Sequence, residues 1–367
     1  MHLLQGSATP AGTRRFRDRS LGGQRAVPAH FRVAPGDISV SSLGLGTYLG
    51  RPDGPTDLAV EHAVRVAVTS GRINVLDTAI NYRHQRAERS VGRALAHLAE
   101  TGVPREEVFV ATKAGYLAPD GESPLGAADW VEKELVGTGV LDPSDIVDGS
   151  HAMSPRYLED QLERSRKNLG LATLDLFYLH NAADAQLPVV GPEEFRRRLA
   201  AAFEFLERAR SDGRILSYGL ATWDALRSVS GEAGFLSLED AVAVAREVGG
   251  ERHGFRFVQM PLNWAMPEAV ARQNQRVHGE RMSAVAAAAR LGLGVFTSVP
   301  LVQGQLARRG PARDGLTPAQ TAIQFARSWP GVLAPLVGQK TAEHLSENLA
   351  LATRPPWGPA EVGALLS

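Results

Sequence analysis

Four side chains that can handle protons stand where short apolar runs of the sequence end: Asp77, Tyr82, Lys113 and His180. Asp77 closes the run INVLD, and Tyr82 follows it at the start of a helical pattern. Lys113 ends the run VFVATK, and His180 ends LDLFYLH. Taken singly, each has an ordinary structural explanation, such as a turn cap, core packing or a solvated strand end. Together, at the ends of three successive runs, they favour a shared site.

The chemistry of such a site would be proton exchange at an oxygen atom. A phenol has an ordinary pKa of about 10 and is a poor acid at neutral pH unless its phenolate is stabilised. An adjacent ammonium stabilises the phenolate, a carboxylate keeps the ammonium charged, and a histidine binds a carbonyl oxygen beside the phenol or shares its proton. This group could protonate a carbonyl oxygen, or deprotonate an alcohol, while hydride moves at carbon. The phenol would be the acid, and the carboxylate would help to set its strength.

The elements that must position these residues alternate regularly from about Val40 onward. Short β-branched runs are separated by amphipathic helical patterns, and several of these patterns end in glycine, the expected left-handed stop. The candidate strands are residues 42–47, 73–77, 108–113, 174–180, 215–222, 255–260, 293–299 and 331–338. The helical patterns are residues 56–71, 86–100, 155–170, 193–213, 238–250, 281–292, 317–330 and 341–352. Eight such units predict an α/β fold, the (β/α)8 TIM barrel, whose chemistry lies at the carboxyl ends of the strands.

The segment ahead of the first strand predicts a further element. The sequences HFRV and ISV flank APGD, which indicates an N-terminal β-hairpin that could plug the barrel floor. We expect residues 1–36 to be an arginine-rich tail or arm lying over the barrel, residues 37–355 to be the barrel domain, and residues 356–367 to be a C-terminal tail.

Two connections are longer than usual, residues 114–154 after the third strand and residues 222–240 after the fifth. Loops that follow barrel strands project from the catalytic face, so we expect both there, with the first walling the substrate pocket. The glycines of LGLGTYLG lack the G-x-G-x-x-G spacing, and no helical pattern begins on them. A dinucleotide-binding open sheet is therefore not favoured.

The composition narrows the class of partner. The 367 residues contain 40 Lys and Arg and 40 Asp and Glu, so no overall field favours nucleic acid or an anionic membrane. The absence of cysteine excludes a disulfide scaffold, thiol catalysis and thiolate metal sites. We see neither a secretory signal nor an uninterrupted apolar span. We expect a soluble, cytoplasmic protein with a small-molecule partner, without nucleic-acid or membrane binding, and no particular oligomeric state is implied.

With these features in place, the sequence resembles the aldo-keto reductase superfamily of NADP(H)-dependent β/α-barrel oxidoreductases. The similar stretches span residues 40–350 and are SLGLGTYLG, NVLDTAINY followed by ERSVGRAL, VFVATKAG, LDLFYLHN, SYGLATW, FVQMPLNW, SVPLVQGQL and PLVGQKTAEHLSENLAL. The resemblance implies that Tyr82 is the general acid/base, that Lys113 lowers its pKa, that Asp77 is the partner of the lysine, and that His180 orients the substrate. It also implies direct hydride transfer from a bound nicotinamide, without a metal.

The cofactor end of the site can be argued physically. Lys340 lies in the first turn of a predicted helix after the eighth strand, where the helix dipole disfavours a cation unless an anion is also present. A 2′-phosphate would supply that anion, so Lys340 and the free amides around Thr341 would bind NADP rather than NAD. An exposed surface lysine is an equally good explanation until the resemblance is considered, which favours NADP(H).

The resemblance implies further cofactor-binding positions, and this chain departs from the commonest pattern at some of them. Thr222 and Gln259 match contacts to the carboxamide, and Glu347 and Asn348 match contacts to adenine. Ser298 stands where many relatives stack an aromatic ring, Thr222 follows alanine where Ser-Asn is frequent, and His344 replaces a frequent arginine. The complete predicted set is Gly46, Thr47, Thr222, Gln259, Ser298, Leu301, Gly304, Gly338, Lys340, His344, Glu347 and Asn348.

The substrate is less constrained than the cofactor. Arg83, His84 and Arg86 could face an anionic or polyhydroxylated substrate, although an arginine near Glu88 is more often part of a solvated pair. Four further side chains either line a pocket or pack within loops: Tyr48, Trp130, His151 and Trp264.

We predict an NADP(H)-dependent enzyme that interconverts an aldehyde or ketone and the corresponding alcohol, and two alternatives stand beside this prediction. The first is a barrel that binds NADP(H) with little turnover and serves as a redox-sensing or regulatory subunit. The second is a barrel hydrolase, which needs converging metal ligands or a pair of carboxylates. The strand ends provide only Asp77 and His180 for that purpose.

Overall fold

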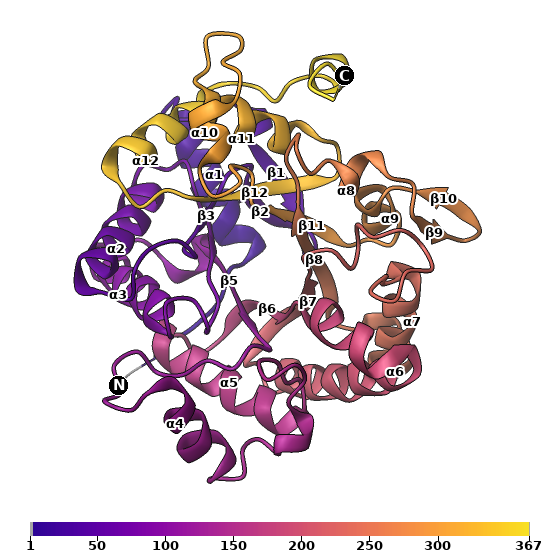
Figure 1. The fold of residues 1–367 in the computed structure, drawn as a ribbon. Helices are drawn as coiled ribbons and strands as arrows, with labels where there is room; N and C mark the ends of the chain where they lie inside the picture. Colours follow the sequence, from indigo (N-terminus) through magenta and orange to yellow (C-terminus); the bar gives the residue numbers. More distant parts are fainter. Residues whose placement is uncertain (1–2, 367) are drawn as a thin grey trace.

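The eight apolar runs form the strands of a closed parallel barrel in the computed structural model, which describes residues 3–366 (Figure 1). Around the barrel the strands follow the order β11-β12-β3-β4-β5-β6-β7-β8, which confirms the predicted (β/α)8 fold. Their bounds are β3 Gly44–Gly46, β4 Val75–Asp77, β5 Phe109–Ala114, β6 Leu174–His180, β7 Ile215–Ala221, β8 Phe255–Pro261, β11 Gly294–Ser298 and β12 Val332–Gly338.

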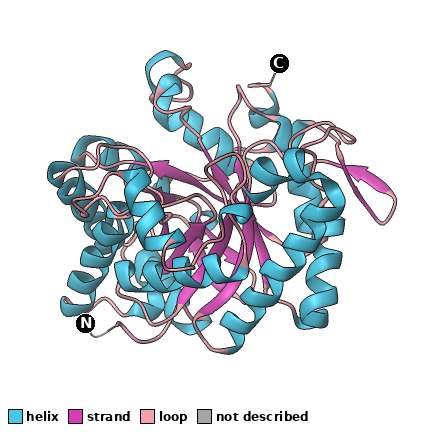
Figure 2. Ribbon diagram, turned by 60° about the horizontal axis from the view of Figure 1, so that its bottom comes forward, coloured by secondary structure: helices cyan, strands magenta, loops and turns pink. Residues whose placement is uncertain are grey.

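Helices cover the outside of the barrel, as a side view shows (Figure 2). Glycines with φ near +73°, Gly71, Gly213 and Gly292, follow three of the predicted helices, because only glycine adopts this left-handed stop without strain. The outer helices are α2 Gly54–Thr69, α3 Arg86–Glu100, α5 Pro155–Leu169, α6 Ala182–Ser211, α7 Leu238–Gly249, α9 Ala284–Arg290, α11 Pro318–Ser328 and α12 Ala342–Leu349. Shorter helices are α4 Ala127–Val131, α8 Glu268–Ala271, α10 Gln305–Arg309 and α13 Pro359–Gly363.

The starts of two helices, α6 and α9, differ from the predicted starts by three residues or more. α6 begins at Ala182 rather than at residue 193 and bends at the non-helical Gly191, which lies between two prolines. α9 begins at Ala284 rather than at residue 281, because residues 280–282 belong to a hairpin of β9 (Gln275–Val277) and β10 (Glu280–Met282). This hairpin extends from the side of the barrel (Figure 2).

The barrel floor is closed by the predicted N-terminal hairpin, formed by β1 (Phe31–Ala34) and β2 (Ile38–Ser41). The buried side chains of Ile38 and Val40 belong to one apolar cluster with interior barrel residues such as Phe109 and Leu176. The hairpin therefore supports the strands that carry the catalytic-face residues from below.

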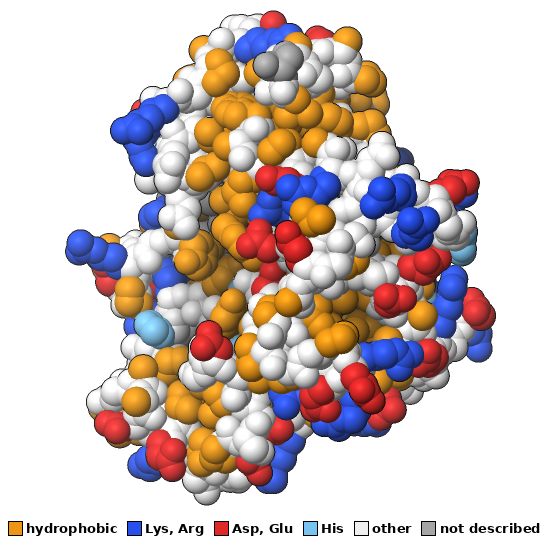
Figure 3. Space-filling view, turned by 45° about the vertical axis from the view of Figure 1, so that its right-hand side comes forward, with side chains coloured by type: hydrophobic (Ala, Val, Ile, Leu, Met, Phe, Trp, Pro, Cys, Tyr) orange, Lys and Arg blue, Asp and Glu red, His pale blue; other side chains and the backbone are white. Residues whose placement is uncertain are grey.

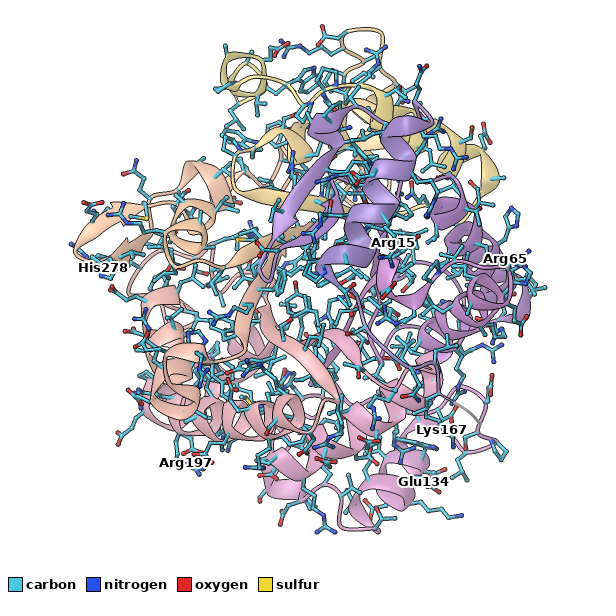
Figure 4. All side chains as sticks on the ribbon, turned by 180° about the vertical axis from the view of Figure 1, so that it is seen from behind. Arg15, Arg65, Glu134, Lys167, Arg197 and His278 are labelled. Carbon is cyan, nitrogen blue, oxygen red and sulfur yellow. The ribbon has the colours of Figure 1, made fainter. Side chains whose placement is uncertain are left out.

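Four of the five arginines ahead of this hairpin lie on a helix, α1 (Pro10–Gly22). Thr9 caps its first turn, and Phe16 buries its ring. The Arg19 guanidinium lies 2.9 Å from the buried Glu107 carboxylate. Seen from behind, α1 and the hairpin lie over the end of the barrel, with the labelled Arg15 on α1 (Figure 4).

The charges on the surface reflect the equal numbers of acidic and basic residues in the sequence. On the face drawn in Figure 3, acidic and basic side chains are interspersed rather than gathered by sign. No helix within residues 3–366 combines the length and the apolar character needed to cross a bilayer.

The histidine at the barrel floor leads to a prediction about acid stability. His30 is fully buried, with Nε2 2.6 Å from the Arg72 carbonyl oxygen and Nδ1 3.0 Å from the Ser42 hydroxyl. Burial, followed by the charge of Arg327, lowers the pKa of His30 from 6.5 to about 3. The unfolded chain therefore binds a proton between these values that the folded chain does not, and the free energy of unfolding falls as pH decreases from about 6.5 to about 3.

The difference between the two pKa values of His30 corresponds to roughly 4–5 kcal/mol. The amide of His30→Gln can still donate to the Arg72 carbonyl oxygen. We expect this variant to avoid most of the decrease in the free energy of unfolding that His30 causes as the pH falls. Urea denaturation of both proteins from pH 7.5 to pH 4 measures the difference. Parallel pH dependences for the two proteins would show that His30 does not contribute.

Candidate active site

The barrel brings the four predicted catalytic residues together at the carboxyl ends of β4, β5 and β6. The Nζ atom of Lys113 lies 2.6 Å from Oδ2 of Asp77 and donates to the Thr78 carbonyl oxygen at 2.8 Å. The same ammonium lies 3.4 Å from the Tyr82 hydroxyl. The ring of Tyr82 meets the ring of His180 edge to face, with centroids 5.7 Å apart. Lys113 is fully buried, so this ion pair is shielded from water.

The strand register explains this convergence. Asp77 is opposite Ala111 on β5, and Lys113, two residues farther along, is opposite Tyr178 on β6. Side chains two residues apart on a strand share a face, so Ala111 and Lys113 both point inward. His180 ends β6, two residues beyond Tyr178, and its side chain also faces the interior.

Asp77 is held by more than the lysine. Nε2 of Gln259 donates to Oδ1 of Asp77 at 2.9 Å, and the Thr47 hydroxyl donates to the Asp77 main-chain oxygen at 3.2 Å. The Thr222 main-chain N–H donates to the Gln259 carbonyl oxygen at 2.8 Å. Gln259 and Thr47 therefore hold Asp77 directly, and Thr222 holds the main chain of Gln259. The contacts of these three residues to a cofactor stay predictions.

The electrostatics of Tyr82 differ from the sequence argument. That argument expected Lys113 to lower the pKa of the phenol. In the structure, burial and then the Asp77 carboxylate raise the pKa of Tyr82 well above 10, because a low-dielectric surrounding and a nearby negative charge both disfavour the phenolate. The hydroxyl therefore carries its proton at neutral pH, as a proton donor must.

Burial also shifts the pKa values of Lys113 and His180, two neighbours of Tyr82. Burial lowers the pKa of Lys113, and the neighbouring Asp77 opposes that change. Burial, followed by the charge of Lys113, lowers the pKa of His180 well below 6.5. His180 is therefore a neutral imidazole at physiological pH, able to donate or accept one hydrogen bond at each nitrogen.

The turn after Tyr82 has an unusual backbone. Arg83, His84 and Gln85 all have positive φ, between 50° and 70°, without a glycine among them. Such residues cost roughly 1–3 kcal/mol each unless their surroundings hold them. Here the Arg83 guanidinium pairs with Asp57, and the Gln85 amide donates to the Ala118 carbonyl oxygen at 2.9 Å. These anchors fix the position of the preceding Tyr82.

The charged residues of this turn do not form the expected solvated pair. Arg83 and Arg86 both bind Asp57, and Arg83 is almost completely buried. Glu88 is buried as well and accepts hydrogen bonds from Thr112 at 2.6 Å and from Asn168 at 2.9 Å. The two arginines are therefore committed to structure rather than to an anionic substrate.

A second segment with positive φ follows β11. Val299, Val302, Gln303 and Gly304 have φ of 56°, 46°, 53° and 85°. Valine is strongly disfavoured in this conformation because its branched Cβ crowds the backbone. The segment coils directly after Ser298 and contains the predicted cofactor residues Leu301 and Gly304, and strain of this kind is concentrated at functional sites.

A small cavity of about 300 Å³ lies beside these two segments. Tyr48 lines it, and the Tyr48 ring contacts the Tyr82 ring edge to face with centroids 5.0 Å apart. Trp130 and Trp264 do not line it, since Trp130 is buried within the segment after β5 and Trp264 packs against Phe325. The cavity is lined by Tyr48, Leu49, Gly50, Pro52, Arg83, His84 and Gln303.

The remaining predicted cofactor residues lie around the end of β12 and on α12. Gly338 is opposite Gly46 on neighbouring strands. Lys340 is partly buried. Its side chain packs next to Gly50, since a Cβ atom built on Gly50 would lie 3.6 Å from Cε of Lys340. The Thr341 side chain caps α12 by accepting a hydrogen bond from the His344 main-chain N–H.

Two residues of α12 already have protein partners. The Glu347 carboxylate accepts a hydrogen bond from the Thr317 hydroxyl, and the Asn348 amide donates one to Oε1 of Gln339 at 3.0 Å. Asn348 is buried. The predicted adenine contacts of Glu347 and Asn348 stay predictions.

Comparison with known proteins places this architecture in a family. The family model of the aldo/keto reductases matches residues 42–309, nearly three quarters of the chain. This chain belongs to the aldo/keto reductase family. The match contains the four converging residues and most of the barrel, and it leaves no support for the hydrolase alternative.

Individual relatives of this aldo/keto reductase are distant. The NADH-specific methylglyoxal reductase of Escherichia coli K12 is 28% identical over 193 residues, which cover 52% of this chain and 50% of that protein. An aldo-keto reductase of Mycolicibacterium paratuberculosis is 25% identical over 294 residues, 80% of this chain and 76% of the relative.

Solved structures support the fold of this aldo/keto reductase. The crystal structure of an aldo/keto reductase from Klebsiella pneumoniae in complex with NADP and acetate superposes with a TM-score of 0.60 at 19% identity, covering 92% of this chain and 94% of that one. A thermostable aldo-keto reductase with the inhibitor epalrestat gives the same TM-score at 17% identity, covering 92% and 98%.

Proposed function

We propose that this protein is a nicotinamide-dependent oxidoreductase that interconverts an aldehyde or ketone and the corresponding alcohol, with NADP(H) as its cofactor. The observation that carries the proposal is the contact of the buried Lys113 with both Asp77 and Tyr82. A purely structural ion pair would not need a phenol beside the ammonium. Methylglyoxal is a candidate substrate because the Escherichia coli relative is named as a methylglyoxal reductase.

Each residue has a defined part in the reduction direction. The nicotinamide, when bound, supplies hydride to the carbonyl carbon. The Tyr82 hydroxyl donates its proton to the carbonyl oxygen, and its O–H bond breaks as the new O–H bond forms. Lys113 stabilises the resulting phenolate, while Asp77 keeps the ammonium charged and in place. His180 hydrogen-bonds the carbonyl oxygen and orients it toward Tyr82.

The site residues fit a nicotinamide dinucleotide with a 2′-phosphate. Lys340 lies near the amino end of α12, where the helix dipole favours an anion. It forms no ion pair with a carboxylate within residues 3–366, so its charge is available to a phosphate. Because the Escherichia coli relative is named as NADH-specific, the preference between the two cofactors needs its own measurement. The predicted cytoplasmic location stays a prediction.

Titration with NADPH and NADH, followed by quenching of tryptophan fluorescence, tests the cofactor. A panel of carbonyl compounds that includes methylglyoxal then tests turnover through the absorbance of the reduced nicotinamide. We expect tighter binding of NADPH and its consumption with at least one carbonyl. Binding without consumption would favour the regulatory alternative, and no binding would overturn the proposal.

Lys340→Ala tests the origin of the cofactor preference. We expect the Kd for NADPH to rise roughly 10- to 100-fold, because one charge-assisted contact to the 2′-phosphate is lost. The Kd for NADH should change less than about threefold, since NADH has no such phosphate. Equal losses for both cofactors would place Lys340 elsewhere in the binding site.

A further inference from the structure

The long segment between β5 and α5 ends in a buried histidine that the proposed mechanism does not use. His151 is fully buried, and its Nε2 lies 2.8 Å from the main-chain oxygen of His180. Its Nδ1 lies 3.0 Å from Nε2 of Gln186 on α6. The imidazole therefore joins this segment to the last residue of β6 and to the helix that follows it.

The direction of each hydrogen bond in this chain of contacts can be fixed. Arg198 has only donors, and its guanidinium lies 3.1 Å from Oε1 of Gln186. The Gln186 oxygen therefore faces Arg198, and its NH₂ group donates to Nδ1 of His151. The single proton of the neutral His151 ring is then on Nε2, which donates to the His180 carbonyl oxygen. Arg198 is in turn held by Glu194 at 2.7 Å.

The ring of His180 is held in place by other rings. Within residues 3–366 its Nδ1 has no hydrogen-bond partner, so no such bond at that atom sets its orientation. Instead, the His180 ring contacts two tyrosine rings edge to face. Its centroid lies 5.7 Å from that of Tyr82 and 5.1 Å from that of Tyr116. Tyr116 is backed edge to face by His151 at 5.3 Å.

Tyr116 is itself fixed at both ends. Its hydroxyl accepts a hydrogen bond from the Asn181 amide at 3.1 Å, and its main-chain oxygen accepts one from the Tyr157 hydroxyl at 2.7 Å. Gly115 makes the approach of His151 possible, because a Cβ there would lie 2.5 Å from Nε2 of His151. Gly115 also has φ of +145°, which favours glycine.

We propose that His151 is a positioning residue for His180, acting through the His180 main-chain oxygen and through the Tyr116 ring. This inference rests on the proposed function, in which His180 orients the carbonyl oxygen. It gives the segment after β5 a role in positioning His180. Burial lowers the pKa of His151 to about 4, so its donor and acceptor stay unchanged at neutral pH.

A matched pair of substitutions tests the proposal. His151→Leu removes the donor to His180, whereas the amide of His151→Gln can still reach the same carbonyl oxygen. We expect His151→Leu to lower kcat roughly 10- to 100-fold, because a displacement of about 1 Å at a reacting group has an effect of this size. His151→Gln should stay within about threefold of the wild-type kcat. The Kd for NADPH should be similar in all three proteins.

A second readout does not depend on turnover. In ¹H–¹³C NMR spectra, the Cε1 signal of His180, assigned with His180→Gln, should shift in His151→Leu and return toward its wild-type position in His151→Gln. If His151→Leu does not fold, Gln186→Leu provides the test, because it removes the donor that holds Nδ1 of His151. A wild-type kcat together with an unmoved His180 signal would overturn the proposal.

The two readouts separate this inference from the proposed function. If the wild-type protein consumes no cofactor with any carbonyl, the proposed function fails, and the NMR comparison still decides whether His151 positions the His180 ring. If the wild-type protein is active and neither variant moves the signal, the proposed function stands and the positioning role fails.

Discussion

Tyr82→Phe is expected to bind NADPH with wild-type affinity and to lose roughly two to four orders of magnitude in kcat, the range typical of a lost general acid. Phenylalanine keeps the ring that packs against Tyr48 and His180 and removes only the hydroxyl near Lys113. Fluorescence titration measures the binding, and the absorbance of the reduced nicotinamide measures the turnover.

A comparison with a second buried phenol makes the Tyr82 result specific. Tyr178 is another buried phenol of the barrel, whose hydroxyl has no partner within residues 3–366. Tyr178→Phe should keep kcat within about threefold of wild type, because no proton transfer is assigned to it. If Tyr82→Phe retained near wild-type turnover with intact cofactor binding, the assignment of Tyr82 as the acid would be wrong.

The barrel could be predicted from the sequence because its signals are local. Each strand is a short apolar run, and glycines such as Gly71 and Gly213 mark the ends of the intervening helices. The hairpin of residues 275–282 gave no such signal, because its strands are three residues each and largely polar. It is anchored by Gln275, whose side chain accepts the Leu238 main-chain N–H.

The N-terminal segment shows the same limit. The sequence analysis expected residues 1–36 to be a tail or arm lying over the barrel and predicted no helix in it, whereas the structure forms helix α1 at Pro10–Gly22. Arg19 pairs with Glu107, far away in the sequence, and only the folded barrel brings these charges together. A compositional argument has no access to that pairing.

The candidate active site was predictable to the extent that it depends on strand ends. Asp77, Lys113 and His180 each end or nearly end a strand, so barrel geometry alone places them side by side. The strain at residues 83–85 was not predictable, because no glycine marks it. The Asp57 carboxylate that holds Arg83 belongs to α2, another element.

The pKa of Tyr82 shows a similar distinction. From the sequence, the neighbouring ammonium is the most visible influence on the phenol. The dominant influence in the structure is burial, and burial depends on how Tyr48 and Tyr116 enclose the site. The identity of the interacting groups was therefore predictable, whereas the balance between their effects was not.

Lys113→Met is expected to reduce both activity and stability. Lys113 is fully buried, and its partner Asp77 is only 5% exposed, so the substitution leaves a carboxylate without a counter-ion in the barrel interior. Removing one member of a buried pair costs roughly 3–5 kcal/mol. Phenolate formation at Tyr82 loses its stabilising cation, so kcat should fall by roughly 10²- to 10⁴-fold. Urea denaturation and steady-state kinetics measure the two effects.

The double variant Lys113→Met with Asp77→Leu separates the two roles of the pair. Replacing both charges by apolar side chains removes the uncompensated carboxylate, so most of the lost stability should return. Activity should not return, because the cation that supports proton donation by Tyr82 is still absent. If the double variant regained turnover together with stability, the ion pair would be structural, and proton transfer would have to depend on His180 and Tyr82 alone.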